Sequence, residues 1–160
     1  MNTQKLEFIT QTFPALIQQA STTAQPLWGK MNFQQMVEHV TDFFKVSNNS
    51  IQLPCLSPIE HLPKLKEFLL SDKEFRENTK APEQIIPAEP LAIRNESVAI
   101  AIEKLNKQIA QFVNYFQENE GAVTTHPVFG TLNFEEWILL HYKHVLHHSK
   151  QFNLVAVKEK

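Results

Sequence analysis

The stretch FGTLNFEEWILLHYKHVLHHSKQF, residues 129–152, contains the start of a long helix and four of the seven histidines of the chain. Asn133 is a typical N-cap residue, and Glu136 follows at the position from which its side chain can bond back to the cap. This capping box predicts a helix that begins near Phe134. The helix should continue to about Phe152, and FNLVAV should then form an extended or frayed tail.

The same pattern occurs earlier in the chain, in WGKMNFQQM at residues 28–36. Asn32 is the cap there, and Gln35 takes the place of the acidic residue. A second helix should therefore run from about Phe33 to Ser47, where SNNS ends it. Both stretches also place large apolar residues at the spacing of a hydrophobic staple, Met31 with Met36 and Leu132 with Trp137.

The spacing of apolar residues predicts two further long helices. One covers residues 96–121, with Ser97 as its cap and Gly121 as its stop. The other runs from about Lys5 to Ala20, and Pro14 should kink it or divide it into two pieces.

Residues 48–96 form a connection that is too long for an ordinary loop. They contain one convincing helical run, KLKEFLLSDKEF at residues 64–75, and six prolines, Pro54, Pro58, Pro63, Pro82, Pro87 and Pro90. No segment alternates polar and apolar residues as a β-strand does for more than a few positions. We therefore predict a single all-α domain over residues 1–160, a four-helix bundle in which residues 48–96 form a long Pro-rich crossover between the second and third helices.

Composition argues against several classes of function. The chain has 15 Lys and Arg residues against 17 Asp and Glu residues, a net charge of −2, and neither sign forms a block. We therefore expect neither a nucleic-acid nor a membrane partner. Cys55 is the only cysteine, so neither an intrachain disulfide nor a zinc site built from thiolates can form. With no signal peptide and no apolar run that could span a membrane, we expect a cytoplasmic protein.

The histidines near the C-terminus lie mostly on one face of their helix. On a helical wheel, His141, His144 and His148 share an arc with apolar residues, whereas His147 points nearer to solvent. Residues four apart stack on one face, so His144 and His148 have the geometry of a chelating pair. His39 lies in the apolar stripe of the second capped helix and is the natural third ligand. Three neutral imidazoles leave one position of a tetrahedral ion open, as in catalytic rather than structural sites.

The residues alone leave three alternatives open. His141 and His144 are a competing pair, which would leave His148 beside the ion rather than bound to it. His126 either lies at the rim of the site or is a turn residue before Pro127. The histidines can also pack in the core without an ion, although burying unpaired imidazoles is costly.

A ligating imidazole usually donates its second N–H to a neighbouring acceptor. Asp42, one turn after His39, and Gln151, three residues after His148, are the candidate acceptors. Asp42 can equally be read as a solvated helix residue.

The stretches HPVFGTLNFEEWILLHYKHVLHHSKQF and PLWGKMNFQQMVEHVTDFF resemble the last helix and the early histidine helix of the DinB/YfiT-like superfamily of metalloenzymes. In that superfamily one histidine comes from the second helix and an H-x3-H pair comes from the last, which implies His39, His144 and His148 as ligands here. Gln151 matches the glutamine that commonly follows the last histidine by three residues. The resemblance also implies an up-down-down-up topology, a nickel or zinc ion and, frequently, a homodimer.

Characterised members of this superfamily include thiol-dependent S-transferases and isomerases that use low-molecular-weight thiols. By resemblance, we expect the three-histidine ion to activate water or a small thiol, in a transferase or hydrolase acting on a small-molecule substrate. The alternative is a non-catalytic, stress-related bundle that binds a metal or another ligand, because no general acid or base is evident near the proposed ligands. Imidazole ligands by themselves do not decide between zinc, nickel, copper and iron.

Overall fold

Both capping boxes form as the sequence predicts. In the computed structural model, which describes residues 1–156, helix α3 spans Phe33–Ser47 and helix α6 spans Phe134–Gln151. In each helix the cap asparagine accepts the N–H of the third helical residue, whose own side chain accepts the N–H of the cap. These bonds are local, so they fix where each helix begins. Residues 152–156 are not helical, and the rest of the expected tail lies outside the described residues.

The other two predicted helices also form. Helix α5 spans Val98–Glu118, and the Ser97 side chain caps it. The N-terminal helix is divided by a π-helical turn, η1, and Pro14 lies in the first turn of the α-helical piece that follows it. The backbone stays helical across this junction, and Pro14 has no N–H group to donate within it, so the interruption lies beside the proline as predicted. The three pieces are α1 (Thr3–Glu7), η1 (Phe8–Thr12) and α2 (Phe13–Gln19).

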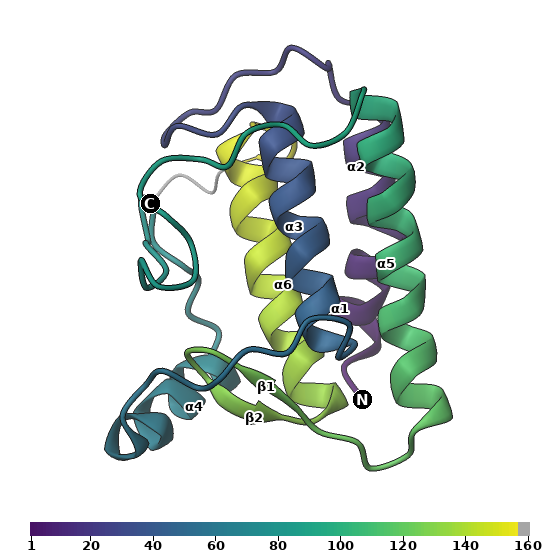
Figure 1. Cartoon of the computed structure of the whole chain (residues 1–160). Helices are drawn as coiled ribbons and strands as arrows, with labels where there is room; N and C mark the ends of the chain where they lie inside the picture. Colours follow the sequence, from purple (N-terminus) through teal and green to yellow (C-terminus); the bar gives the residue numbers. More distant parts are fainter. Residues whose placement is uncertain (157–160) are drawn as a thin grey trace.

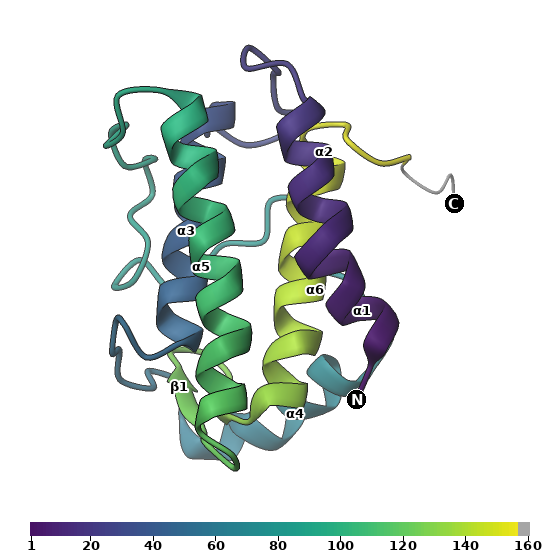
Figure 2. The same cartoon turned by 90° about the vertical axis from the view of Figure 1, so that its right-hand side faces the viewer.

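The long helices lie side by side with their axes roughly aligned (Figures 1 and 2). In Figure 1, α1 and α2 run upward, α3 and α5 run downward, and α6 runs upward again. Because α3 and α5 run in the same direction, residues 48–97 must bring the chain back along the length of the molecule. The described residues confirm a predominantly helical fold with a long connection between α3 and α5.

Helix α4 (Leu62–Leu70) lies within this connection, preceded by a 3-10 turn, η2 (Ile59–His61). The predicted helical run is longer than α4. The helix ends where the buried ammonium group of Lys143, on α6, donates to the carbonyl oxygens of Ser71 and Lys73. A cation at the end of a helix satisfies carbonyl groups that have no partner within the helix.

A small antiparallel sheet precedes α6, in a segment for which we predicted no strand. In it, β1 (Thr124–His126) pairs with β2 (Gly130–Leu132). Each strand has three residues, too few for alternation to be visible in the sequence. Gly130 has a φ of +74°, and a Cβ atom there would lie 3.3 Å from the side chain of Leu62. The sheet is a small departure from the all-α prediction.

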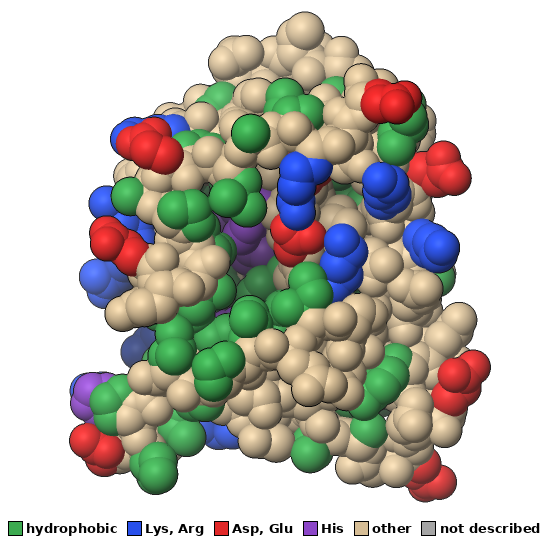
Figure 3. Space-filling view, viewed as in Figure 1, with side chains coloured by type: hydrophobic (Ala, Val, Ile, Leu, Met, Phe, Trp, Pro, Cys, Tyr) green, Lys and Arg blue, Asp and Glu red, His purple; other side chains and the backbone are tan. Residues whose placement is uncertain are grey.

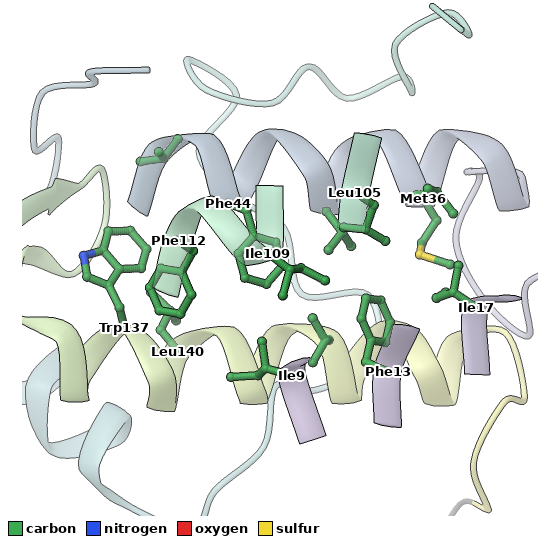
Figure 4. Close-up of a cluster of buried hydrophobic side chains, with 14 of the residues drawn as sticks. Ile9, Phe13, Ile17, Met36, Phe44, Leu105, Ile109, Phe112, Trp137 and Leu140 are labelled. Atoms are coloured by element: carbon green, nitrogen blue, oxygen red, sulfur yellow. The ribbon is translucent and has the colours of Figure 1, made fainter. Parts of the chain in front are cut away.

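The core lies between the long helices, each of which contributes buried apolar side chains (Figure 4). The prediction of one domain over residues 1–160 includes residues that the structure does not describe, and it stays a prediction. Among residues 1–156, no helix combines the length and the apolar character needed to cross a membrane. The core side chains labelled in Figure 4 are Ile9, Phe13, Ile17, Met36, Phe44, Leu105, Ile109, Phe112, Trp137 and Leu140.

Candidate metal centre

Three imidazole rings from two helices converge at one point. His39 extends from α3, and His144 and His148 extend from successive turns of α6. The Nε2 atom of His144 lies 2.9 Å from Nε2 of His39 and 3.0 Å from Nε2 of His148. One ligand atom from each of the three residues lies within 4.8 Å of the others. The three residues predicted as ligands are therefore close enough to hold one metal ion.

This histidine cluster (His39, His144 and His148) lies between α3 and α6. His144 and His148 are buried, and His39 is partly buried. The ring of Phe43, one turn after His39, covers one side of His144 at 4.2 Å between ring centroids. Figure 3 shows histidine side chains within a hollow that has hydrophobic side chains along one edge and charged side chains along the other.

All three imidazoles of the cluster are neutral near pH 7. Burial lowers the pKa of His39 to about 4, although the charge of Asp42 partly opposes this. Burial also lowers the pKa values of His144 and His148 well below the usual histidine range, and the neighbouring rings lower them further. A metal ion binds the lone pair of a neutral imidazole. Near neutral pH, binding therefore requires no loss of a proton from an imidazolium.

The spacing of the nitrogen atoms suits a small divalent ion. Zinc–nitrogen bonds of about 2.0–2.1 Å at tetrahedral angles place two ligand nitrogens roughly 3.3 Å apart. The separations of 2.9 and 3.0 Å around His144 are slightly shorter, so a small outward movement of the rings would seat such an ion. Three imidazoles also leave the fourth tetrahedral position for another ligand.

Gln151 contacts the cluster where a supporting acceptor was expected. Its Oε1 atom lies 2.7 Å from Nδ1 of His148. When Nδ1–H donates to this oxygen, the lone pair of the ring is on Nε2, which faces the other two histidines.

Asp42, the other candidate acceptor, is engaged elsewhere. Its carboxylate accepts hydrogen bonds from Arg94 at 2.7 Å and from Lys45 at 3.4 Å. Asp42 acts on His39 through its charge, which opposes the lowering of the pKa of His39. Its bond with Arg94 ties α3 to the end of the crossover rather than orienting the ring of His39.

His141 lies outside the cluster, so the competing pair of His141 with His144 finds no support in the geometry. Nε2 of His141 lies 2.8 Å from Oγ of Ser47, and its ring stacks on Phe44 at 3.9 Å between centroids. The Ser47 hydroxyl donates to the carbonyl of Phe44, so His141 must donate to Ser47. Burial lowers the pKa of His141 well below its usual value. His141 is a packed core residue.

His126 is the last residue of β1, and its side chain bonds to the turn of the β1–β2 hairpin, close to the turn role that was one of the two predicted for it. Its Nδ1 atom accepts the backbone N–H groups of Val128 at 3.0 Å and Phe129 at 3.1 Å. Burial lowers the pKa of His126 to about 3. Its ring meets the ring of Phe43 edge-on at 5.2 Å, and Phe43 in turn covers His144. The ring of Phe43 therefore contacts both His126 and His144, a member of the cluster.

Sequence reasoning missed a set of contacts beside His39. The buried carboxylate of Glu38 accepts the backbone N–H groups of Arg94 and Asn95 at 3.0 Å and a bond from the Asn95 side chain. Burial by itself raises the pKa of Glu38, but the hydrogen bonds from Asn95, Arg94 and Gln34 outweigh this effect and lower it. These partners are separated by 56 and 57 residues, so no local pattern predicts them.

One protein family, described as "Protein of unknown function (DUF1569)", matches residues 9–154 of the chain. The matched range contains His39, His144, His148 and Gln151. Comparison with curated proteins and with solved structures found no match.

Proposed function

We propose that this chain, which belongs to the DUF1569 family, is a metal-dependent enzyme that binds a divalent cation through His39, His144 and His148. The convergence of three neutral imidazoles carries the proposal. His126 and His141, which lie outside the cluster, have other hydrogen-bond partners. His126 bonds to backbone N–H groups, and His141 bonds to a serine hydroxyl. In the cluster, by contrast, the Nε2 atoms face one another.

We further propose that the fold is the up-down-down-up four-helix bundle of the DinB/YfiT-like superfamily. The directions of the helices in Figure 1 support this proposal, as does the long connection between two helices that run in parallel. The origin of the ligands supports it too, because one histidine comes from α3 and an i, i+4 pair comes from α6.

The chemistry follows from what each side chain contributes. The three imidazoles offer their lone pairs, and Gln151 holds the ring of His148 in place. A bound zinc or nickel ion would supply Lewis acidity, which lowers the pKa of a water molecule or a thiol at its remaining position toward neutrality. Phe43, packed on His144, covers one side of the site.

The proposed substrate is a small molecule that enters through the hollow in Figure 3. A low-molecular-weight thiol suits an ion of this kind, because sulfur is a good ligand for zinc and nickel. Cys55 is exposed and is not part of the histidine cluster, so the thiol would come from a co-substrate. The reaction would be a thiol transfer or a hydrolysis. We also propose that the protein forms the homodimer that its resemblance to the DinB/YfiT-like superfamily implies.

One observation favours a second candidate, a non-catalytic metal-binding protein. Glu38 and Asp42 are the carboxylates nearest to His39 along α3, and both are engaged by Arg94. Neither is therefore placed to act as a general base, which a hydrolase commonly uses.

Metal analysis of the purified protein tests both candidates. We expect about one equivalent of zinc or nickel in the wild type and in a His61→Ala control, which removes an exposed histidine. His39→Ala and His148→Ala should lose the metal and keep the helical circular dichroism spectrum. Less than about a tenth of an equivalent in the wild type would contradict both candidates. Metal-loaded protein that turns over no electrophile with water or a thiol would leave only the second.

A further inference from the structure

Gln151 forms hydrogen bonds at both ends of its side-chain amide. Its Oε1 atom lies 2.7 Å from Nδ1 of His148, and its Nε2 atom donates to the backbone carbonyl of Trp28 at 2.9 Å. Its own backbone carbonyl accepts the N–H of Leu27 at 2.7 Å. The loop before α3 is therefore fastened to the last turn of α6 at the residue that contacts His148.

These bonds determine which ring nitrogen of His148 carries the proton. An amide has a donor at one end and an acceptor at the other, and a half-turn exchanges them. The carbonyl of Trp28 only accepts, so the NH2 group of Gln151 must face it and the amide oxygen must face His148. This oxygen also only accepts, so Nδ1 of His148 must carry the proton. The lone pair is then on Nε2, 3.0 Å from Nε2 of His144.

Gly29 leaves room for this arrangement. Its φ is +80°, and a Cβ atom at this position would lie 2.9 Å from Nε2 of Gln151. A side chain here would therefore push the amide away from the carbonyl of Trp28. The Trp28 ring also packs edge-on against His147 at 5.6 Å, which holds the turn against α6.

We propose that the turn formed by Trp28 and Gly29 is a positioning element of the metal centre. The carbonyl of Trp28 fixes the orientation of the Gln151 amide, and the amide selects the tautomer of His148 that presents a lone pair to the ion. Neither Trp28 nor Gly29 binds the ion. The inference rests on the proposed function for its purpose, but the tautomer is a property of the metal-free protein.

Nitrogen-15 NMR of the histidine side chains tests this in metal-free protein at neutral pH, since it reports which ring nitrogen is protonated. We expect Nδ1–H for His148 in the wild type and a shift toward Nε2–H in Gly29→Ala and Gln151→Leu. Zinc titration of the same variants should give dissociation constants raised by about 10- to 100-fold, as for other groups that support metal ligands. Gly121→Ala is the matched control. Gly121 has a φ of +73° and no atom within 4 Å of an added Cβ, so the variant has the backbone strain without the contact.

The variant Gln151→Glu tests whether the carbonyl of Trp28 acts by orienting the amide of Gln151. The alternative is that Gly29→Ala simply loosens the metal site. In Gln151→Glu both carboxylate oxygens accept, so His148 should keep its proton on Nδ1 without any help from Trp28. Adding Gly29→Ala to Gln151→Glu should therefore leave the tautomer unchanged.

Two results would overturn the inference. One is an Nε2–H tautomer of His148 in the metal-free wild type. The other is an unchanged tautomer and zinc affinity in Gly29→Ala, whatever Gln151→Leu shows. If Gly29→Ala does not fold, an unchanged tautomer in Gln151→Leu overturns the inference. If the wild type shows the Nδ1–H tautomer but binds no zinc, the inference about the ring stands and the proposed function fails.

Discussion

The burial of neutral His126 predicts that the protein is less stable in acid. The Nδ1 atom of this residue accepts two backbone N–H groups of the hairpin, so a proton on that nitrogen would break both bonds. Burial lowers the pKa of His126 to about 3, whereas an unfolded chain has a histidine pKa of about 6.5. The unfolded chain therefore takes up a proton at a higher pH than the folded one does.

From this difference we predict that the stability contributed by neutral His126 is complete above pH 6.5 and is lost progressively as the pH falls toward 3. Within that window one such histidine should lower the free energy of unfolding by about 1.4 kcal/mol per pH unit. Urea denaturation at several pH values, with a chelator present throughout, measures this slope.

The matched variant for this measurement is His126→Asn. The Asn side-chain oxygen can accept the hairpin N–H groups but does not titrate in this range. The slope of stability against pH should therefore be smaller in the variant than in the wild type. Equal slopes would show that His126 is not the group responsible. His141, which is also buried and neutral, contributes in the same direction in both proteins.

Among the helices and strands, the helix starts that the sequence predicts depend on bonds between residues close in sequence, whereas the missed contacts of Glu38 join residues far apart in it. Asn32 and Asn133 determine their helix starts through bonds to residues three positions away, so both starts could be read from the sequence. The three histidines of the cluster could be proposed because each lies on the apolar side of a predicted helix. The hairpin was missed because its strands are very short, and the Glu38 contacts were missed because their partners are distant in sequence.

The contacts of Glu38 with the crossover lead to a second prediction. Glu38→Ala leaves the N–H groups of Arg94 and Asn95 without their acceptor, and it should lower the free energy of unfolding by about 2–4 kcal/mol. Amide hydrogen exchange at these two residues should become faster, because both N–H groups bond to this carboxylate. Urea denaturation and exchange measured by NMR give the two quantities.

Asp42→Ala is the control, because it removes another carboxylate that binds the same arginine. Asp42 is more exposed than Glu38 and binds only side chains, so its removal should cost about 0–1 kcal/mol. Exchange of the Arg94 and Asn95 amides should stay slow in this variant. If the two variants behaved alike, the ion pairs of Arg94 rather than the backbone bonds of Glu38 would hold the crossover.

For the whole molecule, the proposed ion would join α3 to α6, which otherwise contact each other through packing and through the hydrogen bond between His141 and Ser47. A ligand that binds only the folded state stabilises it by about 2.7 kcal/mol when its concentration is 100 times its dissociation constant. For a chain of 160 residues this corresponds to a rise in Tm of about 5–10 °C. We therefore predict that zinc raises the Tm of metal-free wild type by this amount and that a chelator reverses the rise, as measured by differential scanning calorimetry.

The variants of this last experiment show whether the ion joins the two helices. His39→Ala leaves His144 and His148 on a single helix, where an ion bound to both would tie α6 only to itself. Zinc should then change the Tm little, whereas it should still raise the Tm of His61→Ala. A full rise in His39→Ala would mean that α6 holds the ion without α3. In that case the approach of His39 to within 2.9 Å of His144 would reflect packing, and the three-histidine centre would lose its basis.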